Sequence, residues 1–328
     1  MKVLFLIQSP SLPSSRVRAV DLLDDLRRSG LEAEAIPYPR TLREKIRVFA
    51  RCSRCDVVVL QKKLPTWLDT LWLRRSCRRL VYDFDDAVYF RHDESRGPDH
   101  PTGRRRFRNL VGRVDLVIAG NRILADAARV RNARVEILPS AVETRGVPVR
   151  SHVDSPSPLV IGWVGSEVNL PFAASLGPTL RELSREIPVE YRIVCSRPLA
   201  LEGVATTFFP WSAATQAAEI ARFDIGVMPL PKKPFTEGKC AYKALQYMAG
   251  GVPPVVSDVG VNRDVVDGSG LVASSDREFL DHLRALAASA ALRRDLGERA
   301  RRKAERDFSI EVVANRLAAL LRSLGDPA

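Results

Sequence analysis

Strand-length runs of apolar, mostly β-branched residues recur along this chain and alternate with stretches of helical periodicity. A run that is apolar at every position suits a strand buried on both faces, and consecutive parallel strands need a crossover, usually a helix, between them. The pattern therefore predicts an α/β fold with parallel sheets covered by helices on both sides. The predicted strands are residues 2–7, 56–60, 79–83, 115–119, 135–139, 159–165, 189–195, 205–211, 224–230, 252–258 and 270–274.

The alternation is interrupted at residues 144–158 ("TRGVPVRSHVDSPSP"), which are rich in Pro and Ser and have no periodicity. Such a stretch is typical of a linker. We therefore predict two α/β domains, residues 1–150 and 151–308, followed by a C-terminal helix over residues 309–328. That helix has an apolar stripe with which it could pack back on the N-terminal domain: Ile310, Val313, Ala314, Leu317, Leu321 and Leu324.

The bulk composition indicates a globular protein. Of 328 residues, 45% are hydrophobic and 27% are charged, which argues against a disordered chain. The apolar runs are much shorter than the ~20 residues of a membrane-spanning helix, and no signal peptide precedes the first of them. Five scattered cysteines indicate free thiols in a reducing compartment. From these features we expect a cytoplasmic location.

Positive charge is concentrated between residues 40 and 80, where twelve Lys or Arg stand against three acidic residues in a chain of net charge +12. Such a patch attracts a polyanion or an anionic membrane surface. Residues 64–79 ("LPTWLDTLWLRRSCRR") fit either a helix packed on a sheet or an interfacial helix on the inner face of a membrane. The apolar residues at helical spacing there are Leu64, Trp67, Leu68, Leu71 and Trp72.

Two lysines lie four residues apart in "EGKCAYKALQYMAGG", residues 237–251. On a helix this spacing points Lys239 and Lys243 the same way, and Gln246 continues their stripe. Gly238 leaves the preceding backbone bare. A helix start with free N–H groups and two aligned cations suits an anion such as a diphosphate. The alternative is a surface helix with solvated lysines.

The second half of the chain resembles the retaining glycosyltransferases of the GT-B fold, the group 1 or family 4 type. The matching segments, in order, are "IGWVGS", "YRIVC", "FPW", "ARFDIGVMPL", "EGKCAYKALQYMAGGVPPVVSDVG" and "VVDGSGLV". In the first half, "AGNRILADAA", "VEILPSAVE" and "RLVYDFDDAVYF" resemble segments of the same group. The resemblance covers nearly the whole chain, and its most specific block is residues 237–260.

The resemblance implies two Rossmann-like domains facing across a cleft, the first on the acceptor side and the second binding a nucleotide diphospho-sugar. It implies that Glu237 touches the transferred sugar and that Gln246 takes the place of a Glu that binds ribose hydroxyls. Lys239 and Lys243 would then neutralise the leaving diphosphate. The remaining donor-site residues that it implies are Gly165, Ser166, Trp211, Met228, Pro229 and Gly238.

Three carboxylates, Asp83, Asp85 and Asp86, follow the strand predicted over residues 79–83. One interpretation is an acceptor site in which Asp85 or Asp86 accepts the hydroxyl proton or binds sugar hydroxyls. A second is a metal-binding DxD motif, which the doubled α/β layout disfavours. A third is a set of ion pairs with Arg91 or Arg96. In the loop after the first strand, Ser14, Ser15, Arg16 and Arg18 are candidates to meet the acceptor or the donor phosphate.

The combined interpretation is a retaining, metal-independent glycosyltransferase that needs no cofactor. It would move a sugar from a nucleotide diphospho-sugar to a hydroxyl of a glycan or lipid-linked acceptor. A nucleotide-sugar 2-epimerase would need a constellation of His and acidic residues that does not stand out. A basic nucleic-acid-binding protein would need a reading motif that is missing, so nucleic acid is not an expected partner. An inactive transferase-like binding subunit stays open because of Gln246.

Overall fold

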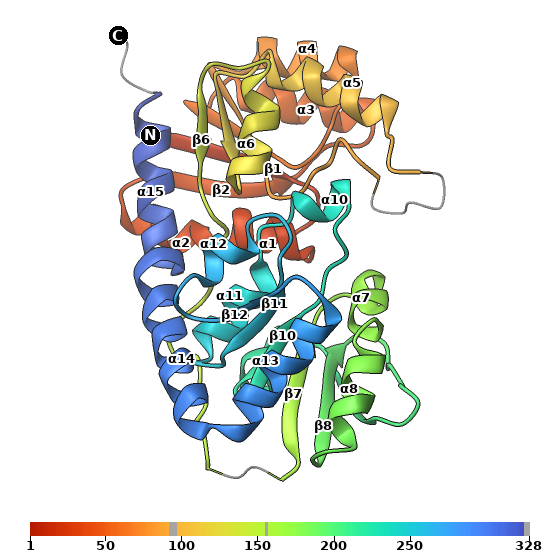
Figure 1. The fold of residues 1–328 in the computed structure, drawn as a ribbon. Coiled ribbons are helices and arrows are strands. Elements are labelled where there is room, and N and C mark those ends of the chain that lie inside the picture. Colours follow the sequence, from red (N-terminus) through yellow and green to blue (C-terminus); the bar gives the residue numbers. More distant parts are fainter. Residues whose placement is uncertain (92–96, 155–156, 325–328) are drawn as a thin grey trace. The chain divides into compact units, whose positions relative to one another are not determined.

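The structure of the chain is a computed structural model that describes residues 1–91, 97–154 and 157–324. The chain divides into two compact units (Figure 1). The first unit comprises Met1–Ala141, Lys233–Cys240 and Ile310–Ala328, and the second comprises Val142–Lys232 and Ala241–Ser309. Each unit is built around one six-stranded sheet in which every pair of neighbouring strands is parallel, as the alternating pattern predicted.

The sheet of the first unit has the strand order β2-β1-β3-β4-β5-β6. Its central strands are buried almost throughout because their consecutive apolar side chains point into both faces. Its strands are β1 (Lys2–Ile7), β2 (Glu32–Pro37), β3 (Val57–Gln61), β4 (Arg79–Phe84), β5 (Leu116–Ala119) and β6 (Val135–Ile137).

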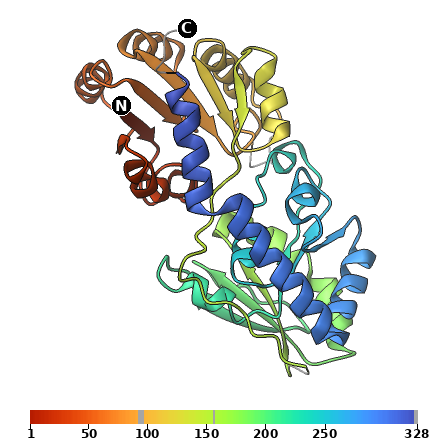
Figure 2. The same cartoon turned by 90° about the vertical axis from the view of Figure 1, so that its left-hand side faces the viewer.

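Helices cover both faces of this sheet and complete two hydrophobic cores. One face carries α3 (Leu42–Cys52), α4 (Trp67–Ser76), α5 (Pro101–Val111) and α6 (Arg122–Arg129). The other carries α2 (Leu23–Arg28) and the C-terminal helix α15 (Ile310–Arg322), and α1 (Pro13–Arg18) precedes α2 in the chain. Figure 2 shows α15 lying along this second face, where its predicted apolar stripe is buried against the strands.

The sheet of the second unit has the order β12-β11-β10-β7-β8-β9. Its strands are β7 (Leu159–Val164), β8 (Val189–Cys195), β9 (Ala205–Pro210), β10 (Ile225–Met228), β11 (Pro254–Ser257) and β12 (Leu271–Ala273). One face packs on α7 (Leu170–Ala174), α8 (Gly177–Ser184) and α13 (Asp276–Ala288). The other packs on α9 (Gln216–Ile220), α11 (Tyr242–Ala249) and α12 (Asn262–Val266), and α14 (Ala290–Lys303) contributes side chains to both cores.

Residues 233–240, which the sequence analysis placed in the C-terminal domain, pack with the first unit. They contain the short helix α10 (Pro234–Glu237). A side chain at Gly238 would not fit there, because its Cβ would lie 2.6 Å from the Cβ of Ala87. Gly238 is therefore required for the close packing of this segment against Ala87. The prediction had instead explained this glycine as bare backbone that could meet an anion.

All strands of a parallel sheet end at the same edge, so the loops that follow them gather there. Ligands of doubly wound α/β folds bind at this carboxyl edge. In the first unit the edge holds the residues that follow β1, β3 and β4, and in the second it holds those that follow β7, β9 and β10. Most of the candidate residues named above lie at these two edges.

Candidate functional site

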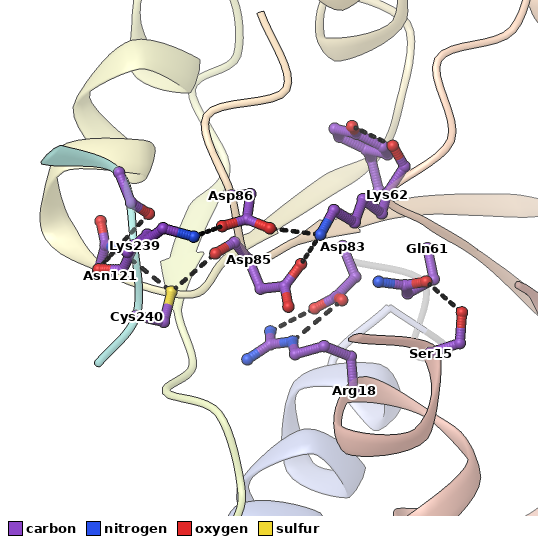
Figure 3. Close-up of polar contacts among 12 residues, drawn as sticks. Ser15, Arg18, Gln61, Lys62, Asp83, Asp85, Asp86, Asn121, Lys239 and Cys240 are labelled. Atoms are coloured by element: carbon purple, nitrogen blue, oxygen red, sulfur yellow. Dashed lines mark hydrogen bonds and ion pairs between the residues drawn. The ribbon is translucent and has the colours of Figure 1, made fainter. Parts of the chain in front are cut away.

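The carboxyl ends of β3 and β4 bring five polar residues of the first unit together (Figure 3). They are Gln61 and Lys62 at the end of β3, and Asp83, Asp85 and Asp86 at the end of β4. Gln61 and Asp83 are paired in the sheet register. Lys62 adopts a left-handed backbone with φ of 59°, which non-glycine residues rarely do. The turn aims its side chain at the carboxylates of the next strand (Figure 3).

Arg18 and Asp83 form a buried bidentate ion pair in which Nε and Nη2 of the arginine donate to the carboxylate. Nη1 donates to the carbonyl of Leu138 at 2.7 Å. Burial disfavours the charged guanidinium, but the carboxylate of Asp83 outweighs it, so the pKa of Arg18 is raised. Burial raises the pKa of Asp83, and the contact with Arg18 offsets part of that rise. Arg18 therefore holds Asp83 in place.

Lys62 sits between two carboxylates, with Nζ 3.2 Å from Asp85 and 2.5 Å from Asp86. Burial alone would lower the pKa of Lys62, but these two charges raise it, so the lysine stays cationic. The far side of Asp86 faces Lys239, whose Nζ is 4.0 Å from it. Three carboxylates and three cations thus balance one another within this cluster.

The segment that carries Lys239 is fixed to the first unit by Asn121 and Cys240. Asn121 caps α6 with its Oδ1, and its Nδ2 donates to the carbonyls of Gly238 and Lys239 at 3.0 and 3.2 Å. The thiol of Cys240 donates to the carbonyl of Asp85 at 3.1 Å. Burial raises the pKa of this thiol, so it remains neutral.

Helix α1, which follows β1, contributes two further predicted residues. Ser15 is buried, and its hydroxyl donates to Oε1 of Gln61 at 3.1 Å. Arg16 is half-buried and pairs with Asp21 at 3.6 Å. Within the described part of the chain, Nε2 of the buried Gln61 has no hydrogen-bond partner. An unmet buried donor costs about 1–3 kcal/mol, so an acceptor oxygen that reached this amide would lower the free energy of the site.

In the second unit, the side chain of Lys243 lies over the ring of Trp163, with Nζ 5.5 Å from the ring centroid. Gly165, which follows β7, leaves space for this arrangement. A Cβ there would lie 2.6 Å from the ring of Trp163 and 2.7 Å from Cε of Lys243. Ser166 is exposed beside it and accepts a hydrogen bond from Asn169. Lys243 thus lies in the first turn of α11, next to the end of β7.

Two other predicted residues of the second unit are joined by Gln216. Its Oε1 accepts from Nε1 of Trp211 at 2.8 Å and from Nε2 of Gln246 at 3.1 Å. Trp211 is 36% exposed, so it is not a core residue. Met228 and Pro229, at the end of β10, are buried.

The prediction that Lys239 and Lys243 share one helix is wrong. Helix α11 begins at Tyr242, and Ala241 before it has a left-handed φ of 53°. Lys239 belongs to the first unit, and Lys243 belongs to the second. The contacts of Asn121 with the preceding residues end the continuous helical path that the spacing suggested.

The ion pairs that the structure shows for the three carboxylates come from Arg18, Lys62 and Lys239. Ion pairs with Arg91 or Arg96 were one of three interpretations of the sequence, and these three cations were not expected as the partners. Arg96 lies outside the described residues. Arg18 was a candidate to contact a ligand directly, but it is buried and fully engaged. The geometry gives it a positioning role instead.

Comparison with solved structures decides the fold. HepE of Anabaena, crystallised with UDP and glucose, matches over 98% of this chain and 100% of its own, at 15% identity and a TM-score of 0.73. The chain has the GT-B fold. Sucrose-phosphate synthase from Thermosynechococcus elongatus matches over 99% of both chains at 14% identity with a TM-score of 0.73. A glycosyltransferase from Rickettsia africae matches over 100% of this chain and 99% of its own at 11% identity with a TM-score of 0.75.

The predicted GT-B fold is therefore confirmed. No protein-family model matches the sequence, and no curated protein matches it. Within the described residues, no helix combines the length and apolarity needed to cross a bilayer. In those same ranges, no group of three His, Cys, Asp or Glu side chains is arranged to hold a metal ion.

Sequence reasoning missed four residues of these sites: Gln61, Lys62, Asn121 and Gln216. A signal existed for Gln61 and Lys62, because they are the first two residues after the strand predicted at 56–60 and therefore had to lie at the carboxyl edge. Asn121 stands where an N-cap is expected before a helical stretch. Gln216 carried no signal, because its role depends on two partners on separate elements.

Proposed function

We propose that this chain transfers a sugar from a nucleotide diphospho-sugar to a hydroxyl group of a glycan or lipid-linked acceptor. The observation that carries the proposal is the likeness, over essentially the full length, to HepE, which was solved with UDP and also with UDP-glucose. The proposed transfer retains the anomeric configuration and needs no essential metal, as the sequence resemblance implies.

The proposed donor site is at the carboxyl edge of the second sheet. Lys243, in the first turn of α11, would face the diphosphate, helped by the partial positive charge of the helix start. Gly165 and Ser166 would contact the phosphates through backbone and hydroxyl groups. Gln246 would bind the ribose, and the base would lie near Trp211, Met228 and Pro229.

In the proposed reaction, the bond between the anomeric carbon and the diphosphate oxygen breaks, and the acceptor oxygen bonds to that carbon. Negative charge grows on the leaving diphosphate, so a fixed cation stabilises the transition state more than the ground state. Lys243 is the primary candidate for this cation. Lys239 is a second candidate whose charge is already shared with Asp86. Glu237 is proposed to contact the transferred sugar.

The acceptor is proposed to bind at the carboxyl edge of the first sheet. Asp85 or Asp86 would bind its hydroxyls or accept the hydroxyl proton, with Lys62 holding both carboxylates in position. The free amide of Gln61 would donate to an acceptor oxygen. Ser15 and Arg16 lie in α1, the helix that follows β1.

The donor is tested with a thermal-shift panel of UDP-, GDP-, ADP- and dTDP-sugars, followed by a transfer assay with the sugar that stabilises the chain. We expect Lys243→Met to lower kcat/KM by at least about 100-fold, because it removes the charge. The methionine keeps most of the packing on Trp163, so folding should not change. Arg299→Met, an exposed cation of α14, is the matched control and should keep full activity.

Two results would contradict the proposal. Full activity in both Lys243→Met and Lys239→Met would remove the cationic role from these lysines. Binding of a nucleotide sugar without transfer to any glycan or lipid-linked acceptor, and without its hydrolysis, would indicate a binding subunit instead of an enzyme.

A further inference from the structure

Two neighbouring helices of the first unit begin with exposed apolar side chains. Leu42 and Ile46 lie in the first two turns of α3, and Trp67 and Leu68 open α4. Each of the four is between 55% and 68% exposed. Single exposed apolar residues are ordinary, but a group of large ones on adjacent helix starts marks an interaction surface.

Two contacts between the helices make these side chains one surface. Nζ of Lys45 on α3 is 2.8 Å from Oδ1 of Asp69 on α4. The rings of Phe49 and Trp72 meet edge to face with centroids 5.0 Å apart. Ile46 lies three residues before Phe49, and Leu68 lies four residues before Trp72, so both lie on the helix faces that meet at this ring contact.

The same helix α4 also packs inward, which divides its apolar stripe into two parts. Thr70 and Leu73 are buried, and Trp72 is half-buried against the core. The later turns of α4 therefore match the first alternative for residues 64–79, a helix packed on a sheet. Trp67 and Leu68, in its first turn, take no part in that packing and are exposed.

The charge around these apolar residues is positive. Arg40, Arg43, Arg47 and Lys63 are exposed. Residues 40–47 and 62–69 are all described, and each of the two acids among them already has a partner. Glu44 accepts from the backbone N–H groups of Arg40 and Thr41, and Asp69 pairs with Lys45. The amino ends of α3 and α4 add partial positive charge.

We propose that this surface, the α3–α4 patch, docks the chain on a membrane rich in anionic lipid. The patch consists of Leu42, Ile46, Trp67 and Leu68 with the cations Arg40, Arg43, Arg47 and Lys63. Tryptophan and aliphatic side chains insert at the boundary of head groups and acyl chains, and the flanking cations meet anionic head groups. A second copy, paired symmetrically, would bring the same positive charge against itself. A nucleic acid would meet the cations but leave the apolar side chains exposed.

The place of the patch connects it with the acceptor. Helices α3 and α4 follow β2 and β3, so they begin at the carboxyl edge of the sheet that holds Lys62, Asp85 and Asp86. Docking would bring this edge to the lipid surface, which fits a lipid-linked acceptor. The link to a lipid-linked acceptor rests on the proposed function, whereas the docking itself does not.

The test is co-sedimentation of the full chain with phosphatidylcholine vesicles that contain about one third phosphatidylglycerol. Binding is expected to these vesicles and to be at least about tenfold weaker to phosphatidylcholine alone. Trp67→Ser/Leu68→Ser should weaken binding at least about tenfold by removing the inserted groups. Arg43→Glu/Arg47→Glu should weaken it by more than about twentyfold, at about fivefold or more for each arginine.

Matched variants control for exposure and charge. Val130→Ser removes an exposed apolar residue at the end of α6, and Arg299→Glu/Arg302→Glu reverses two exposed charges on α14. Both should bind vesicles like the wild type. Lipids brominated in their acyl chains should quench tryptophan fluorescence in the wild type, and the quenching should fall in Trp67→Phe.

Unchanged vesicle binding in both patch variants would overturn the proposal. So would an absence of vesicle binding combined with a self-association that Trp67→Ser/Leu68→Ser abolishes, which would assign the patch to a second copy. Vesicle binding that depends on the patch in a chain that transfers no sugar would uphold docking and overturn only the proposed function.

Discussion

The carboxyl edges of the two sheets differ in how their polar groups are held. In the first unit, Arg18, Lys62 and Lys239 each face a carboxylate, and the whole cluster is largely buried. In the second unit, Lys243 lies on an aromatic ring, and the neighbouring polar groups joined by Gln216 are neutral. A charge-balanced cluster keeps its geometry without a ligand. The neutral hydrogen bonds of Gln216 are weaker than buried ion pairs, so they are more readily exchanged for contacts with a ligand.

The largest effect should come from breaking the buried pair of the first unit. Arg18→Ala leaves the carboxylate of Asp83 buried without its partner, and the free energy of unfolding should fall by about 3–5 kcal/mol. Urea denaturation followed by far-UV circular dichroism measures it, with the first unit expected to unfold at lower urea than the second.

Two variants show whether the uncompensated charge is the cause. Arg18→Met/Asp83→Leu removes both charges and should be less destabilising than Arg18→Ala alone. Arg16→Ala removes a more exposed arginine from the same helix and should cost less than about 1 kcal/mol. Equal losses in Arg18→Ala and in the double variant would contradict the account.

The next largest effect should come from removing the charge of Lys62, which lies between two carboxylates. Lys62→Met should lower the free energy of unfolding by about 2 kcal/mol while leaving donor binding by the second unit unchanged. Because the pKa of Lys62 is raised on folding, its contribution should be complete below the ordinary value of 10.5. It should be lost as pH rises above that value and through the folded pKa.

Comparing wild type with Lys62→Met at each pH isolates this lysine from the tyrosines, which titrate in the same range. The difference in unfolding free energy should stay constant from neutral pH to about 10 and then shrink. A difference that grows with pH would mean that the lysine is neutral in the folded state.

The buried strands could be predicted from the sequence because their apolar runs are continuous and admit few other structures. The predicted strand at residues 189–195 coincides with β8, and the strand at 2–7 coincides with β1. Strand β2 was not predicted, because its "EAEAIP" alternates charged and small residues. It is an edge strand that pairs only with β1, so it lacks the pattern of a strand buried on both sides.

The sites were less predictable because their geometry depends on residues far apart in the chain. Arg18 and Asp83 are 65 positions apart. Their spacing predicted Lys239 and Lys243 on one helix, because no feature of the neighbouring sequence predicts the left-handed backbone of Ala241. The break follows from contacts between residues 238–240 and Asn121, which is more than a hundred positions away. Local periodicity cannot contain that information.

A smaller effect should follow from crowding the second site. Gly165→Ala places a Cβ against the ring of Trp163 and Cε of Lys243. Trp163 is fixed in the core, so the lysine must move. We expect a loss of about 1–2 kcal/mol in unfolding free energy. We also expect nucleotide-sugar binding, measured by isothermal titration calorimetry, to weaken about tenfold. Gly177→Ala, where an added Cβ would meet only ordinary van der Waals contacts with Leu201 at 3.6 Å, serves as a control for glycine replacement and should leave binding unchanged.

The smallest effect should come from Gln216, which orients two partly exposed side chains through one oxygen. Gln216→Ala releases Trp211 and Gln246, and the free energy of unfolding should fall by about 1 kcal/mol. Gln216→Glu keeps an acceptor oxygen for both donors, so thermal denaturation should show it recovering most of that loss. If the glutamate variant is as unstable as the alanine variant, the amide of Gln216 stabilises the fold by something other than accepting these two hydrogen bonds. The second site would then be held by contacts more specific than the neutral hydrogen bonds described for it.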